Sequence, residues 1–233
     1  MLVFATSCQI SETIHLKEDG SGKIVLMRLR DESSYMQVAG ENYLKEEKFV
    51  DTAYVFKDFI MKYKETFSRL PPFEQTIFQK FANVKVHLKK SSYDKEFRTT
   101  ITQDFNRLIE VADLYKTEEY VDDIENNYAL TAEEHYYEVG YAFDGKIFER
   151  NVKITDIVEL KKQQDIIESY KKQLFNFKIN QPYVLNYHFP RRIKSVSNTE
   201  AKISEDRKSV SLEFLLSDCL QNPELSNLKV VLE

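Results

Sequence analysis

Alternating apolar and polar residues predict β-strands along much of the chain. The clearest pair is 10–16 and 23–29, which flanks Asp19-Gly20-Ser21-Gly22, a sequence typical of a tight hairpin turn. Asp144-Gly145 predicts a second hairpin between 137–143 and 147–154. The same period of two predicts further strands over 84–88, 97–101 (after a turn at 91–94), 183–189, 210–216 and 229–232.

Apolar residues at steps of three and four predict helices between these strands. The longest covers 46–68, with Phe49, Ala53, Phe56, Ile60, Tyr63 and Phe67 on one stripe and Pro71-Pro72 after its end. Three more helices are predicted over 73–82, 105–116 (capped by Asp104) and 156–175 (capped by Thr155). The polar segments 31–42 and 117–134 are predicted to be connections.

Hairpins that alternate with helices predict an α+β fold. We expect an antiparallel sheet built from hairpins, with about four helices packed on one of its faces. The 233 residues can bury one sizeable core or two small ones, and no Pro/Gly/Ser-rich linker divides them. We therefore expect a single domain over 9–233, with a break near 126–134 as the alternative.

The N-terminal residues resemble the end of a bacterial lipoprotein signal. Ala5-Thr6-Ser7 directly precede Cys8, which would become the lipidated first residue, so 1–8 would be a signal remnant. Only seven residues precede Cys8, and none is Lys or Arg. Either the true start lies upstream, or the chain is cytosolic and Cys8 is an ordinary buried residue. The other cysteine, Cys219 in an apolar strand end, is predicted to be a packed free thiol.

Charge and hydropathy bear on three kinds of partner: a membrane, a nucleic acid and a basic protein. No apolar run approaches the roughly 18 residues of a membrane-spanning helix, so a membrane tie would come from the N-terminus. A net charge of −5 argues against nucleic-acid binding. Ten of the acids lie within 104–134, against only Arg107 and Lys116. That segment is either a solvated face or a docking surface for a basic partner.

No motif for catalysis or metal binding emerges. The four histidines (His15, His87, His135 and His188) lack zinc-ligand spacing, and 122–127 lacks the spacing of a calcium loop. No serine lies in a nucleophile elbow. We expect no cofactor and no enzymatic activity, and the alternative is a hydrolase assembled from residues distant in sequence.

Aromatic residues and one basic cluster suggest a ligand site. The chain has 16 Phe and 14 Tyr but no Trp, and the basic run 190–194 follows an aromatic strand. We predict an aromatic-lined space between the sheet and the long helix, with arginine available to pair with an anionic group. The candidate residues are Phe56, Phe59, Tyr187, Phe189, Arg191 and Arg192. The arginines could instead only guard a strand edge against pairing.

Two stretches carry a family likeness. Residues 8–22 resemble the start of uncharacterised lipoproteins from the Bacteroidetes and flavobacterial group. Residues 183–196 and 204–216 are similar to the end of the mycobacterial LppM-type lipoprotein domain, with Arg207 where such a turn more usually has glycine. The resemblance implies a lipid-anchored protein of the bacterial cell envelope that faces the periplasm or the cell surface. Our leading hypothesis is a non-enzymatic protein that binds a lipid-like amphipathic ligand or an envelope protein. The alternative is an assembly subunit that docks a basic partner through 104–134.

Overall fold

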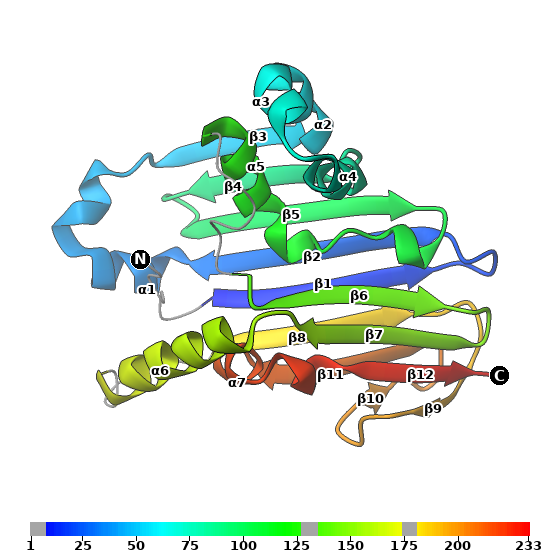
Figure 1. Cartoon of the computed structure of the whole chain (residues 1–233). Helices are drawn as coiled ribbons and strands as arrows, with labels where there is room; N and C mark the ends of the chain where they lie inside the picture. Colours follow the sequence, from blue (N-terminus) through cyan, green and yellow to red (C-terminus); the bar gives the residue numbers. More distant parts are fainter. Residues whose placement is uncertain (1–7, 127–134, 174–180) are drawn as a thin grey trace.

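The computed structural model describes residues 8–126, 135–173 and 181–233, which form two β-sheets and several short helices (Figure 1). The larger sheet has eight strands. In spatial order they are β10 (Lys202–Ile203), β11 (Ser209–Leu215), β8 (Pro182–His188), β1 (Cys8–Leu16), β2 (Gly22–Asp31), β5 (Glu96–Phe105), β4 (Lys85–Ser91) and β3 (Phe49–Val55). All neighbours are antiparallel except β1 and β8, which pair in parallel from Ile10 opposite Tyr183 to His15 opposite His188.

The second sheet is antiparallel and has four strands. Their spatial order is β6 (Tyr137–Phe143), β7 (Ile147–Ile154), β12 (Leu228–Leu232) and β9 (Ile193–Val196). The α-helices are α1 (Glu32–Ala39), α2 (Phe56–Lys62), α3 (Lys64–Arg69), α4 (Pro72–Lys80), α5 (Thr117–Asn126), α6 (Ile157–Gln173) and α7 (Leu216–Gln221). The short 3-10 helices are η1 (Gly40–Lys45), η2 (Leu108–Glu110), η3 (Leu114–Lys116) and η5 (Pro223–Ser226).

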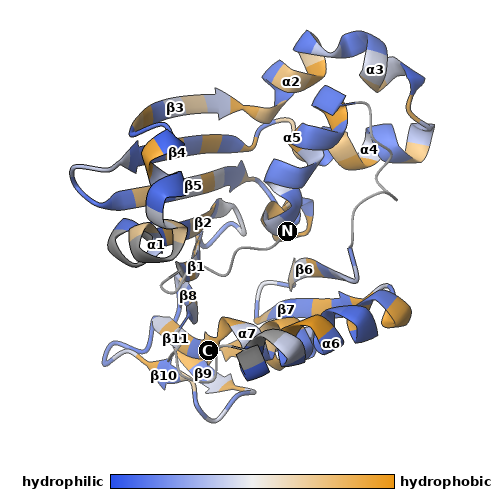
Figure 2. Cartoon of the chain, turned by 90° about the vertical axis from the view of Figure 1, so that its left-hand side faces the viewer, coloured by the Kyte–Doolittle hydropathy of each residue, from blue (hydrophilic) through white to orange (hydrophobic). Residues whose placement is uncertain are grey.

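One face of the larger sheet carries most of the other elements. Helices α2 to α5 cover one part of it, and the smaller sheet with α6 and α7 covers another part (Figures 1 and 2). Side chains on the covered face form one hydrophobic cluster that extends from Phe56 and Phe78 under the helices to Tyr187 and Phe148 between the sheets. Within the described ranges, no helix has the length and apolarity to cross a bilayer.

The α+β class and the hairpins predicted from the sequence are confirmed, but the sheet arrangement differs in detail. The strands divide between two sheets instead of one, and β1 pairs with β8 in parallel. The β1 and β8 segments lie more than a hundred residues apart in the sequence, so no local turn signal specifies their pairing. The helix predicted over 73–82 is present as α4, with Pro72 in its first turn, where a missing N–H costs nothing.

The prediction of one helix over 46–68 is wrong for the first third of that range. Residues 49–55 form β3, and the helical part is divided into α2 and α3. Val50, Thr52 and Tyr54 also alternate with period two, and pairing with β4 selects that pattern over the helical one. Phe49 and Ala53, assigned to the helical stripe, are exposed as a result.

Five further predictions are corrected. Asp104 does not cap a helix over 105–116, because β5 runs to Phe105 and only the short η2 and η3 follow. The expected connection 31–42 instead contains α1 and part of η1. The expected connection 117–134 contains α5, and its residues 127–134 lie outside the described residues. Thr155 does not cap α6; the cap is Asp156, whose Oδ1 accepts the backbone N–H of Val158 and Glu159. Cys219 lies in α7, not in a strand end, although the prediction of a buried free thiol is confirmed.

Arg207, at the turn where glycine is more usual, has a φ of 58°. This is the left-handed region that favours glycine. Its guanidinium donates to the carbonyl of Ile193 at 2.7 Å from Nη2 and 3.0 Å from Nε. These bonds help to hold the strained conformation and tie the turn to β9.

Candidate functional site

A cavity of about 880 Å³ lies against the covered face of the larger sheet. Its sheet wall comes from β1, β2, β5 and β8, at the end of the sheet where β1 begins, and includes Ile10, Arg28, Phe97 and Tyr183. Helices η3 and α5 form one side wall, and α6 and α7 form the opposite one. The cavity is therefore assembled from distant parts of the chain.

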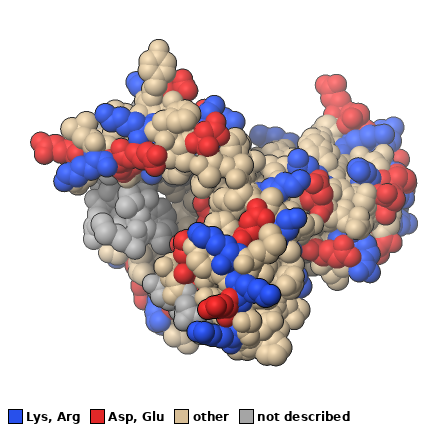
Figure 3. All heavy atoms as spheres, turned by 90° about the horizontal axis from the view of Figure 1, so that it is seen from above, with Lys and Arg blue, Asp and Glu red and all other residues tan. Residues whose placement is uncertain are grey.

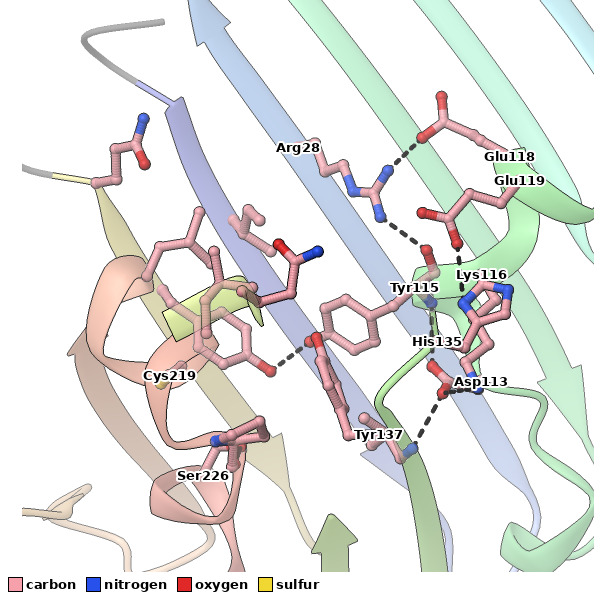
Figure 4. A pocket seen from close by; sticks show the side chains of 18 of the residues that line it. Arg28, Asp113, Tyr115, Lys116, Glu118, Glu119, His135, Tyr137, Cys219 and Ser226 are labelled. Atoms are coloured by element: carbon pink, nitrogen blue, oxygen red, sulfur yellow. Dashed lines mark hydrogen bonds and ion pairs between the residues drawn. The ribbon is translucent and has the colours of Figure 1, made fainter. Parts of the chain in front are cut away.

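The wall on the η3 and α5 side is charged (Figure 4). The Arg28 guanidinium donates to the Glu118 carboxylate and, at 2.9 Å, to the carbonyl of Tyr115. Lys116 Nζ lies 3.8 Å from Asp113 Oδ2, and Asp113 also accepts the N–H of Val139 at 3.0 Å. Burial raises the pKa of Asp113, an effect that the Lys116 charge opposes. Positive and negative groups thus alternate along this wall.

An ion pair between the two sheets supports the floor of the cavity, which Arg150 lines. Glu12 of β1 is fully buried, and Arg150 of β7 is 1% exposed. Arg150 Nε lies 3.2 Å from Glu12 Oε1, and Arg150 Nη1 donates to Ser226 Oγ at 2.8 Å. Burial disfavours the charged guanidinium, but the Glu12 charge and the surrounding tyrosines together outweigh burial and hold the pKa of Arg150 above its ordinary value. The pair joins β1 of the larger sheet to β7 of the smaller one.

Tyrosine hydroxyls surround this ion pair. Tyr187 and Tyr115 donate to the two Glu12 oxygens at 2.5 and 2.7 Å, and Arg150 Nη2 donates to the Tyr183 hydroxyl at 2.6 Å. Burial is the main cause that raises the pKa of all three tyrosines well above the ordinary value. They stay protonated and offer O–H groups, and Tyr137 lies beside Tyr115 in the same view (Figure 4).

The opposite wall is mostly apolar. It includes Ile166 and Ile167 of α6 and Leu216, Cys219 and Leu220 of α7. Burial raises the pKa of the Cys219 thiol to about 12, so the thiolate needed for nucleophilic chemistry is scarce at neutral pH. This wall can pack a hydrocarbon group, and its single thiol is inert.

His135 is the histidine that borders the cavity. Its Nδ1 lies 3.5 Å from Glu119 Oε2, while Nε2 is buried with no hydrogen-bond partner in the described structure. Burial, together with the Lys116 charge, lowers the pKa of the ring to about 4. His135 is therefore neutral at physiological pH, despite the nearby carboxylate.

The other histidines lie away from this site. His15 and His188 stack on each other with ring centroids 4.3 Å apart, and His87 contacts Asp51 at 2.8 Å. Across the described ranges, no group of three or more His, Cys, Asp or Glu side chains is arranged to hold a metal ion. No described cluster therefore offers a ready-made set of metal ligands.

The four aromatic residues proposed as ligand contacts from the sequence lie in two different parts of the hydrophobic cluster. Phe56 is fully buried against Phe78 and Phe81, and Phe59 packs edge-on to Tyr54. Tyr187 and Phe189 pack on Phe148 between the sheets. None of the four lines the large cavity, although Tyr187 reaches its floor through Glu12.

The two proposed arginines lie beyond the far end of β8. Arg191 Nε is 3.2 Å from a Glu18 oxygen, and its Nη1 donates to the carbonyl of Glu233 at 3.0 Å. Arg192 is exposed. Neither lines the cavity, so the structure does not bring the arginines together with the aromatic residues around that space. Their part in binding stays a prediction.

The acidic segment 104–134 forms many contacts within the chain. In its described part, Asp104 lies near Lys85, Glu110 binds Arg107, Glu118 binds Arg28, and Glu125 accepts from Tyr63. On the face seen in Figure 3, Lys and Arg side chains are interspersed with Asp and Glu, and no continuous acidic patch forms among the described residues. Glu133 and Glu134 lie outside the described residues, and the docking of a basic partner through this segment stays a prediction.

Comparisons with known proteins find little. No family of known proteins and no curated protein matches the sequence. The chain is similar to a solved structure, the NMR structure of the folded domain of Mycobacterium tuberculosis LppM, with a TM-score of 0.42 and 9% identity. The match covers 100% of this chain and 93% of that one. A likeness at this level does not establish a shared fold, and the flavobacterial resemblance has no support from these comparisons.

Proposed function

We propose that this chain is a non-enzymatic, lipid-anchored protein of the bacterial cell envelope that holds an amphipathic ligand in the large cavity. The observation that carries the proposal is the pairing of a charged, hydroxyl-bearing wall with an aliphatic wall around one space. The volume of about 880 Å³ lies within the range of roughly 300–1,000 Å³ typical of small-molecule sites.

The charges in the wall indicate the kind of polar group that would fit. Each lining cation has an acidic partner within the chain: Arg28 with Glu118, Lys116 with Asp113, Arg150 with Glu12, and Arg30 with Glu32. The wall therefore has no excess of positive charge to attract an anion. It suits a neutral or zwitterionic head that both donates and accepts hydrogen bonds, with an acyl or similar chain against α6 and α7.

Binding fits the site better than catalysis does. The Cys219 thiol is protonated, with a pKa of about 12. The floor carboxylate of Glu12 already accepts three hydrogen-bonding partners, so it has little freedom to act as a base. A fully satisfied polar network of this kind is rigid, which suits a preorganised binding surface better than proton transfer.

Displacement of a dye by a single-chain lipid tests the cavity. The probe is 8-anilinonaphthalene-1-sulfonate, and the competitor is lysophosphatidylcholine below its micelle concentration. We expect saturable displacement from the wild-type protein. Ile166→Glu, which places a charge in the apolar wall, should weaken lysophosphatidylcholine binding by about ten-fold or more. Ile157→Glu, on the same helix but outside the cavity, is the matched control and should bind like the wild type.

Equal binding by both variants, or no displacement at all, would contradict the ligand site.

The anchor is tested separately, by the intact mass of the protein extracted from the membranes of the cells that naturally make it. A chain that begins at Cys8 and carries a diacylglyceryl adduct would support the anchor. An unmodified soluble chain that starts at Met1 would reject it, and with it the envelope location.

A further inference from the structure

Three large apolar side chains project into solvent from one end of the larger sheet. Leu44 in η1 is 70% exposed, Phe49 at the start of β3 is 62% exposed, and Tyr93 in the β4–β5 turn is 95% exposed. Exposed apolar side chains that are scattered singly are ordinary, whereas ones that gather on neighbouring segments mark a candidate interaction surface. This end projects beyond the sheet at the left of Figure 1.

Backbone and side-chain contacts join these loops into one surface. The N–H of Ser92, next to Tyr93, donates to the carbonyl of Lys48 at 2.9 Å, and Phe49 pairs with Ser91. The Tyr43 hydroxyl, next to Leu44, donates to the buried Glu32 at 2.8 Å and accepts the Ser92 hydroxyl at 2.7 Å. The three apolar side chains are therefore carried on mutually bonded segments.

The strand register places this surface at the same end as Cys8. Across the sheet, Cys8 pairs with Arg30, Arg30 with Phe97, Phe97 with Lys90, and Lys90 with Val50, the neighbour of Phe49. Arg30 and Phe97, in the middle of this row, line the cavity. The row thus connects the proposed lipid anchor, the cavity and the projecting apolar side chains.

We infer that this end of the molecule docks on a lipid bilayer, with Leu44, Phe49 and Tyr93 inserted into the interface. Lysine lies within two residues of each of them, at Lys45, Lys48 and Lys95, as suits side chains with an apolar stem and a charged tip at the headgroup level. Acids at Glu46, Glu47, Asp94 and Glu96 offset these charges, so insertion of apolar groups would dominate over attraction to anionic lipid.

This docking surface goes beyond the proposed function, because a ligand could bind the cavity in free solution without it. With both in place, the cavity would lie beside the bilayer, and an amphipathic ligand could pass between membrane and protein without crossing water. The two ideas can fail independently, since one is measured with vesicles and the other with monomeric lipid.

Tryptophan fluorescence tests the docking directly, because the chain contains no Trp. Tyr93→Trp is introduced into the full chain together with Cys8→Ser, so that an acyl anchor cannot mediate binding. The probe is a phosphatidylcholine vesicle. We expect a blue shift of the emission on addition of vesicles, and quenching when the acyl chains are brominated. Phe73→Trp, at a position 61% exposed on α4, is the matched control and should show neither.

Serine substitutions give a second, quantitative readout. The triple variant Leu44→Ser, Phe49→Ser and Tyr93→Ser should co-sediment with phosphatidylcholine vesicles at least about ten-fold more weakly than the parent. A triple control at similarly exposed positions, Met61→Ser, Phe73→Ser and Ile109→Ser, should sediment like the parent. Both triples should keep the parent's far-ultraviolet circular dichroism and cooperative thermal unfolding, which shows that they are folded.

Three outcomes would overturn the inference. The first is equal sedimentation of the two triple variants, and the second is a tryptophan emission of the Tyr93→Trp variant that vesicles do not shift. The third is loss of self-association in the first triple without any change in vesicle binding. That last result would assign the surface to a second copy of the chain.

Discussion

At the scale of single residues, the Glu12–Arg150 pair stands out because both charges are buried. Moving both charges out of water is costly, and only their mutual attraction and a complete set of hydrogen bonds offset that cost. The tyrosine hydroxyls and Ser226 complete that set. Removing one partner would leave the other charge buried and unpaired.

Arg150→Met should therefore lower the free energy of unfolding by about 3–5 kcal/mol, measured by urea denaturation. Adding Glu12→Gln to Arg150→Met should recover part of the loss, because no uncompensated charge then remains. Lys229→Met breaks a comparable but exposed contact with Glu149, at 2.9 Å, and should cost less than about 1 kcal/mol. Similar losses from Arg150→Met and Lys229→Met would contradict this account of the floor.

His135 should make stability depend on pH. Its folded pKa of about 4 lies below the ordinary value of 6.5, so between these values the unfolded chain binds a proton that the folded chain does not. The free energy of unfolding should fall as the pH decreases from 6.5 to 4, by at most about 3 kcal/mol from this residue. Subtracting the pH profile of His135→Gln isolates the effect from that of the carboxylates. Parallel profiles would show that the ring titrates normally.

At the scale of elements, the first hairpin shows how closely a turn is packed. Gly20 has a φ of 81°, within the Asp-Gly turn itself. At Gly22, which begins β2, an added Cβ would lie 2.2 Å from the carbonyl oxygen of His15 and 2.7 Å from the Phe105 ring. Glycine is needed there because β1 and β5 both approach the backbone.

Gly22→Ala should accordingly lower the melting temperature, with a loss of about 1–3 kcal/mol in unfolding free energy. Gly140→Ala, where an added Cβ meets nothing within 4 Å, is the control from the second sheet and should be nearly neutral. Thermal denaturation of the two variants measures the difference. A neutral Gly22→Ala would mean that the hairpin relaxes easily.

Elements whose conformation is specified by nearby residues could be predicted from the sequence. Elements whose conformation depends on pairing with a distant strand could not. The Asp-Gly turns specify both hairpins within a few residues of sequence. By contrast, 49–55 satisfy a helical and a strand period at once, and only β4 decides between them. The β1–β8 pairing likewise joins segments from opposite ends of the sequence.

Part of the candidate site did have a signal in the sequence. Glu12 interrupts the apolar phase of β1 between Ile10 and Ile14, and Arg150 interrupts that of β7 between Phe148 and Val152. Two opposite charges on the buried faces of two predicted strands indicate a buried pair. The side walls had no comparable signal, because Arg28, Tyr115 and Ile166 meet only through the tertiary fold.

At the scale of the whole molecule, the cavity exists because the smaller sheet and the α2–α5 helices cover different parts of one sheet face (Figure 2). The cavity between these two layers is bordered by η3 and α5 on one side and by α6 and α7 on the other. The charged wall therefore lies with the α2–α5 helices and the aliphatic wall with the smaller sheet, which the ion pair between Glu12 and Arg150 joins to the larger sheet.

Photo-crosslinking tests the central claim, that this cavity holds an amphipathic ligand, most directly. A lysophosphatidylcholine with a diazirine on its acyl chain is bound below its micelle concentration, irradiated, and located by mass spectrometry of the digested protein. The account predicts crosslinks in α6 and α7, at or beside Ile166, Ile167, Leu216 and Leu220, and their loss in Ile166→Glu but not in Ile157→Glu. Crosslinks at Phe56, Phe59 or Phe189, or labelling spread over the surface without preference, would contradict it.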